Sequence, residues 1–139
     1  MTRTTQEIVA ELDSFAPPND DWDKLQSLLD ELWTDGAPED AIPNIIAVFE
    51  RYPINEDGCG VFWSALHGLE TLRGYEPYLL DSVQKSPSEF VVMMLGRILN
   101  AKIDIICDTS IITTLNAVAQ SQTNAEPIRE MASAFLQQR

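Results

Sequence analysis

The single histidine, His67, is the first residue of this chain that could take part in chemistry, because Glu70 follows it three positions later. On a helix this spacing places both side chains on one face, where an imidazole and a carboxylate can bind a metal or transfer a proton. One histidine and one carboxylate make an incomplete metal site, and the sequence has no second histidine. We therefore predict a structural role, in which Glu70 or a backbone carbonyl satisfies a half-buried imidazole and Trp63 packs beside it. The sequence predicts no metal site and no cofactor.

The two cysteines give no clear nucleophile. Cys59 lies at an expected helix start, where the helix dipole favours a reactive thiolate, but nearby carboxylates oppose that effect. Cys107 follows two isoleucines and is predicted to lie in the core. No histidine or asparagine partner can be assigned to either thiol, so we expect the protein not to be an enzyme. A small metal-dependent or thiol enzyme that uses His67, Glu70 and Cys59 is the less favoured alternative.

Acidic residues are concentrated in the first half of the chain. The protein carries 22 acidic and nine basic residues, a net charge of −13, which argues against nucleic acid and anionic membranes as partners. Residues 1–60 hold fourteen of the acids and three of the bases. This uneven distribution predicts a cationic protein partner, although a solvated acidic face without a partner is the alternative. The acids expected to meet that partner are Asp20, Asp21, Asp23, Asp30, Glu31, Asp35, Glu39 and Asp40.

The segments that would position these residues are predicted to be helices. Three places show the pattern Ser/Thr-x-x-Glu, in which the two side chains cap a helix reciprocally, namely Thr4 with Glu7, Ser86 with Glu89, and Thr123 with Glu126. Apolar residues at helical spacing follow each pattern. Further helices are predicted over residues 43–52, 60–73 and 76–85. Residues 103–115 fit either a helix or a strand, because the β-branched residues there oppose the helical spacing; over 108–120 a helix is favoured.

The most acidic helix is predicted to begin at Asn19 or Asp20 and to end at Thr34, before Gly36. Its leucines and both of its tryptophans, Trp22 and Trp33, fall on one arc, and its acids fall on the opposite arc. We predict that both tryptophans belong to the core; the alternative is that they anchor a bound partner beside the acids. Within the helix over 60–73, Gly68 predicts the close approach of a neighbouring helix.

A weak internal repeat favours a particular all-α architecture. Two segments match at an offset of 34 residues, and each runs into a second, more apolar helix. A helix pair that recurs near this period is typical of an α-solenoid. We predict one domain over residues 1–139, made of seven or eight helices in antiparallel pairs that stack in the HEAT-like manner, with a homodimer as an open option. The matching residues are Pro43, Ile45, Ile46, Phe49 and Pro53 with Pro77, Leu79, Leu80, Val83 and Pro87.

Several of these segments resemble small bacterial immunity proteins, the cognate inhibitors of polymorphic toxins, including those of contact-dependent growth inhibition. The resemblance covers about residues 43–100 and is carried by 43–46, 52–53, 62–70 around Trp63, His67 and Glu70, 75–82, 87–90 and 94–100. It implies an acidic protein that neutralises a basic, nuclease-like toxin by covering its active site or an adjacent surface, without a cofactor. A generic helical-repeat adaptor or scaffold with another partner is the alternative.

The expected location is the cytoplasm. No apolar run approaches the ~18 residues of a membrane span, and the first residues have no apolar core or cleavage signal of a secretory peptide. Two cysteines in an unexported chain are expected to be free thiols.

Overall fold

The computed structural model describes residues 3–17, 21–54 and 59–138, although the side chain of Cys59 lies outside this description. These residues form eight α-helices, one 3-10 helix and one short β-hairpin, which confirms the mostly helical prediction. No helix in the described ranges is long and apolar enough to cross a membrane. Contacts within the chain separate two compact units, Met1–Tyr75 and Glu76–Arg139. The single domain over residues 1–139 stays a prediction.

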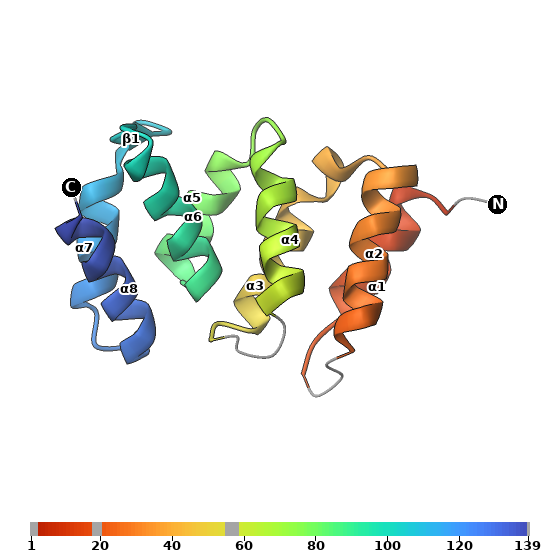
Figure 1. Ribbon diagram of the computed structural model, residues 1–139, viewed down its shortest axis with the longest axis horizontal. Coiled ribbons are helices and arrows are strands. Elements are labelled where there is room, and N and C mark those ends of the chain that lie inside the picture. The colour runs from red at the N-terminus through yellow and green to blue at the C-terminus, as the bar shows by residue number, and fades with distance from the viewer. Residues whose placement is uncertain (1–2, 18–20, 55–58, 139) are drawn as a thin grey trace. The chain divides into compact units, whose positions relative to one another are not determined.

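The first unit places its helices in two layers. Helix α1 packs against α2 and α3, and α4 packs against α2 and α3, so α1 and α3 form one layer and α2 and α4 the other (Figure 1). The described elements of this unit are α1 (Thr5–Ser14), α2 (Trp22–Asp35), the 3-10 helix η1 (Pro38–Ala41), α3 (Ile42–Arg51) and α4 (Cys59–Glu70).

Aromatic side chains fill one end of the first unit. The ring of Trp22 lies 5.7 Å from that of Phe15, 5.1 Å from that of Tyr52 and 5.8 Å from that of Phe62, between centroids. Arg51 closes this end, because its guanidinium donates to the backbone carbonyls of Leu12 and Phe15. Trp22 and Trp33 are both half-buried and lie at the edge of the core, so the prediction that both belong to the core is only partly correct.

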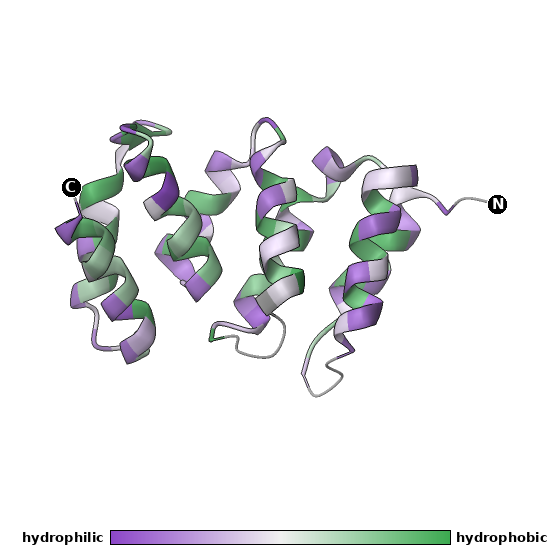
Figure 2. Ribbon diagram, viewed as in Figure 1, coloured by the Kyte–Doolittle hydropathy of each residue, from purple (hydrophilic) through white to green (hydrophobic). Residues whose placement is uncertain are grey.

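The second unit is built around one buried helix. Helix α6 (Glu89–Asn100) packs against α5 (Glu76–Lys85), α7 (Ile111–Gln120) and α8 (Glu126–Gln137). Figure 2 shows α6 with mostly hydrophobic residues, as expected for a helix covered by three others. Gly96 permits this packing, because a Cβ atom there would lie 2.3 Å from Cγ of Phe135 on α8. The buried residues of α6 are Phe90, Val91, Val92, Met94, Leu95, Gly96, Ile98 and Leu99.

Residues 103–115 form both of the structures that the sequence left open. Strands β1 (Ile105–Ile106) and β2 (Thr109–Ser110) pair antiparallel, and α7 begins directly afterwards with Ser110 as its N-cap. The turn between the strands is Cys107–Asp108, with φ values of 50° and 58°. The prediction that Cys107 lies in the core is wrong: its side chain is exposed, because a two-residue hairpin turn stands at the surface.

Two of the three predicted capping patterns are wrong. Thr4 and Glu7 form the predicted reciprocal box. Ser86, however, directly follows the last residue of α5, and its N–H donates to the carbonyl of Ser82 in that helix. Ser88 caps α6 instead. Helix α8 begins at Glu126, so its N-cap position is Ala125 and not Thr123, and alanine has no side chain that could cap the helix. The Thr123 hydroxyl is bonded to that of Ser121 at 2.8 Å.

The remaining helix boundaries are close to the predicted ones. The helices over 43–52 and 76–85 are observed as α3 and α5, and α4 ends at Glu70, earlier than predicted. Asn19 and Asp20, the two residues predicted to begin α2, both lie outside the described residues. The observed cap of α2 is Asp21, whose Oδ1 accepts from the N–H of Lys24 at 3.1 Å. Gly36 follows the last residue of α2 as predicted.

Candidate functional site: an acidic surface on the first unit

The solvent side of α2 carries a polar stripe. Asp23, Ser27, Asp30 and Thr34 are all exposed, and their spacing of four, three and four residues places them in one row along the helix. The leucines that hold α2 against its neighbours lie on the opposite side, as the predicted arcs required. Figure 2 shows that hydrophilic residues recur along this helix. The buried leucines are Leu25, Leu28, Leu29 and Leu32.

Helix α4 lies directly beside α2, because Gly68 makes room for Trp33. A Cβ atom at position 68 would lie 2.7 Å from Cζ2 of the indole, so the close approach predicted from Gly68 is confirmed. Trp33 itself is half-buried. On α4, the side chains of Ser64 and His67 are exposed, and α4 contacts α2.

His67 has the neighbours that the sequence predicted but is more exposed than expected. Its ring stacks on Trp63 with 5.5 Å between centroids, and its Nδ1 lies 3.8 Å from Oε1 of Glu70. The histidine side chain is 60% exposed, so it belongs to the surface. Among the described residues, no three histidine, cysteine, aspartate or glutamate side chains gather as metal ligands. The proposed thiol of Cys59 lies outside the described side chains.

Of the eight acids predicted to bind a partner, two make other interactions and a third is not described. Asp20 lies outside the described residues. Asp21 caps α2, and this cap uses one of its carboxylate oxygens. Glu31 is half-buried and accepts two hydrogen bonds from Arg3, from Nη2 at 2.6 Å and from Nε at 2.8 Å. Arg3 is a residue that the sequence reasoning missed, and the signal for it was its rarity as one of three bases in residues 1–60.

The Arg3–Glu31 ion pair shifts the pKa of both of its members. Hydrogen bonds from the guanidinium hold the pKa of Glu31 below its ordinary value, and hydrogen bonds to Glu31 and then Glu11 raise the pKa of Arg3. Nη1 of Arg3 also lies 3.0 Å from Oε2 of Glu11. Glu31 and Arg3 are therefore both charged at neutral pH.

The other five predicted acids are exposed and have no salt bridge to any lysine or arginine in the described part of the chain. We call them the open acids. Asp30 accepts a hydrogen bond from the neutral amide of Gln26. Asp35 lies in the last turn of α2, where no basic residue offsets the negative end of the helix. The open acids are Asp23, Asp30, Asp35, Glu39 and Asp40.

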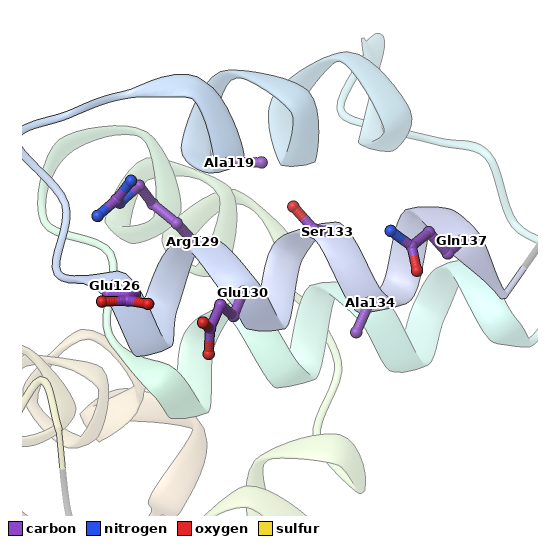
Figure 3. A pocket seen from close by; sticks show the side chains of 7 residues that line it. All are labelled: Ala119, Glu126, Arg129, Glu130, Ser133, Ala134 and Gln137. Carbon is purple, nitrogen blue, oxygen red and sulfur yellow. The ribbon is translucent and has the colours of Figure 1, made fainter.

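A hollow in the described surface lies elsewhere, on the second unit. It measures about 610 Å³ and runs along α8, with Ala119 of α7 at its edge (Figure 3). Arg129 faces this hollow, but its Nε already donates to the carbonyl of Asn124. None of the predicted site residues lines it. The remaining lining residues are Glu126, Glu130, Ser133, Ala134 and Gln137.

Comparisons of this chain with protein-family models, with curated proteins and with solved structures find no match. The function of the acidic surface is therefore inferred from its own geometry and charge.

Proposed function

We propose that this protein is an immunity protein that binds and neutralises a cognate, basic toxin by protein–protein contact in the cytoplasm. The observation that carries the proposal is the set of open acids, whose carboxylates are exposed and form no salt bridge with a lysine or arginine among the described residues. Carboxylates that only stabilise a fold are expected to be paired or to cap helices. Asp35 does neither, and its position in the last turn of α2 is unfavourable for the helix.

The mechanism is electrostatic steering followed by contact. Unpaired surface charge of one sign attracts a partner of the opposite sign, which raises association rates by about 10- to 1,000-fold and weakens as salt is added. Helix α2 then offers the exposed Asp30, and the adjacent helix α4 offers the exposed His67 stacked on Trp63. Trp63 beside His67 supplies apolar area of the kind that is enriched at binding hot spots.

We further propose that the helices are copies of a HEAT-like repeat. Helices α3 and α5 have the same length and are offset by 34 residues at both ends. The matching residues Ile45 with Leu79, Ile46 with Leu80, and Phe49 with Val83 are buried in both helices. Small-angle X-ray scattering tests this architecture, because a stacked solenoid of 139 residues is longer than a compact globule of the same mass.

Co-expression with the product of the gene directly upstream tests the proposed function. An immunity protein restores growth when that product is toxic, whereas an adaptor with another partner does not. His67→Ala distinguishes neutralisation by contact from the enzyme alternative. Neutralisation by contact is expected to survive this change, whereas an enzyme that uses His67 is expected to lose its activity. The proposal fails if the neighbouring product is harmless, or if the two purified proteins do not bind.

A charge-reversal pair tests which surface makes the contact. Asp30→Lys with Asp35→Lys changes the charge by +4 on the acidic surface, and the second change suits the end of α2. We expect association with the basic partner at low salt to slow by about tenfold or more. The matched control is Asp104→Lys with Glu130→Lys, which makes the same charge change at exposed sites of the second unit. Equal rates for the two double variants exclude this surface as the steering site.

A further inference from the structure

The side chain of Arg3 lies between two carboxylates that belong to different helices. Its Nε and Nη2 donate to the two carboxylate oxygens of Glu31 on α2, and its Nη1 lies 3.0 Å from Glu11 on α1. Arg3 precedes Thr4, the N-cap of α1, and is therefore outside both helices. We call Glu11 and Glu31 the clamp.

The position of the clamp depends on the packing of α1 against α2 and does not depend on Arg3. These two helices are in contact along the unit, and each is fixed by its own buried residues, Ile8 and Leu12 on α1 and the four leucines on α2. The two carboxylates face one point, so without a cation between them they repel each other. Glu31 accepts two parallel hydrogen bonds from one side chain. This geometry is specific to a guanidinium, because an ammonium cannot make two parallel hydrogen bonds to one carboxylate.

We propose that the clamp is an arginine-binding site, which Arg3 fills in the free protein and from which an arginine of the basic partner displaces it. The inference rests on the proposed function for the identity of the partner. Glu31 directly follows Asp30, one of the open acids, so a cation drawn to α2 arrives beside the clamp. All three side chains are accessible to it, with exposures of 34% for Arg3, 38% for Glu11 and 26% for Glu31.

Release of Arg3 leaves the rest of the first unit in place. The reciprocal cap of α1 is made by Thr4 and Glu7, neither of which needs the guanidinium. Arg3 therefore acts as a competitor that lowers the apparent affinity for any other cation. If Arg3 fills the clamp in about nine of ten molecules, an external guanidinium binds about tenfold more weakly than it would to an empty clamp. A partner with an arginine and further basic residues overcomes this competition at a far lower concentration than an isolated cation does.

Removal of Arg3 tests the inference without the toxin. Arg3→Ala is titrated with ethylguanidinium and, separately, with ethylammonium at low millimolar concentration, and binding is followed by NMR at the Glu31 and Glu11 amides. We expect ethylguanidinium to bind the variant about tenfold more tightly than the wild type, and more tightly than ethylammonium does. Arg3→Ala with Glu31→Gln is the matched control and is expected to lose this binding. The variants are checked for folding by circular dichroism.

Equal binding of ethylguanidinium to wild type and Arg3→Ala overturns the competition by Arg3. Equal binding of the two probes, or unchanged binding after Glu31→Gln, overturns the clamp as an arginine site and leaves only general attraction of cations. If Arg3→Ala does not fold, the titration of the wild type with ethylguanidinium tests the proposal instead. Displacement of Arg3 shifts the NMR signal of its Nε–H, and a signal that does not shift contradicts the proposal. These outcomes do not depend on toxin neutralisation, so the clamp and the proposed function can fail separately.

Discussion

Gly96→Ala is expected to destabilise the second unit, although alanine is the better helix former. Gly96 is buried in α6, and a Cβ atom there would lie 2.3, 2.4 and 2.5 Å from Cγ, Cδ2 and Cδ1 of Phe135. These atoms are the base of the ring, next to its own backbone. The phenyl group therefore cannot relieve the overlap by turning its far end, and α8 has to move.

The magnitude follows from two opposing terms. Replacing glycine by alanine in a helix interior contributes about 1 kcal/mol of stability. Overpacking a core costs about 1–3 kcal/mol, and here the upper end applies because ordinary contact requires a shift of about 1 Å. We therefore expect a net loss of about 2 kcal/mol in the free energy of unfolding.

Urea unfolding followed by circular dichroism measures this loss. Gly60→Ala on α4 is the matched control, because a Cβ atom there would meet no atom within 4 Å, and we expect it to be neutral or slightly stabilising. In a Phe135→Ala background the overlap is absent, so Gly96→Ala is expected to add up to about 1 kcal/mol of stability. A Gly96→Ala protein as stable as the wild type, or an equal loss in both backgrounds, refutes the packing argument.

The same experiment tests the predicted single domain over residues 1–139. All three tryptophans, at positions 22, 33 and 63, belong to the first unit, whereas Gly96 and Phe135 belong to the second. If the chain unfolds as one cooperative domain, Gly96→Ala shifts the fluorescence transition together with the circular dichroism transition. A fluorescence transition that stays in place contradicts the single domain.

Two further predictions concern charges of the first unit. Hydrogen bonds from Arg3 lower the pKa of Glu31, and hydrogen bonds from the backbone and then the hydroxyl of Thr4 lower that of Glu7. Because both folded-state pKa values are depressed, their stabilisation is present at neutral pH and is lost as the pH falls through the range where glutamates protonate, near 4 and below. Urea unfolding followed by tryptophan fluorescence should show this loss, with a shallower pH dependence in Glu31→Gln; an unchanged dependence contradicts the assignment. Asp35→Asn removes an unfavourable charge from the last turn of α2 and should raise the stability by about 0.3–1 kcal/mol, measured in the same way; a loss of stability would show that Asp35 has a favourable contact.

Local patterns of the sequence predicted most of the helices. The spacing of apolar residues located α5 at its observed bounds and placed the acids of α2 opposite its leucines, because helical periodicity depends only on residues within a few turns. The Thr4–Glu7 cap was predictable for the same reason. The cap at Ser86 was not predictable in this way, because the N–H of Ser86 is hydrogen-bonded to the preceding helix α5. Which of two successive helices a residue joins is not visible in a local pattern.

By itself, the sequence determined that the chain is mostly helical, that its negative charge lies in the first half, and that α2 presents acids to solvent. Only the tertiary structure decided which of those acids are open. Glu31 pairs with Arg3 across 28 residues, and Trp33 meets Gly68 through the packing of α2 against α4. Contacts at such separations depend on which helices pack together and in which register, and this information is distributed over all the buried residues.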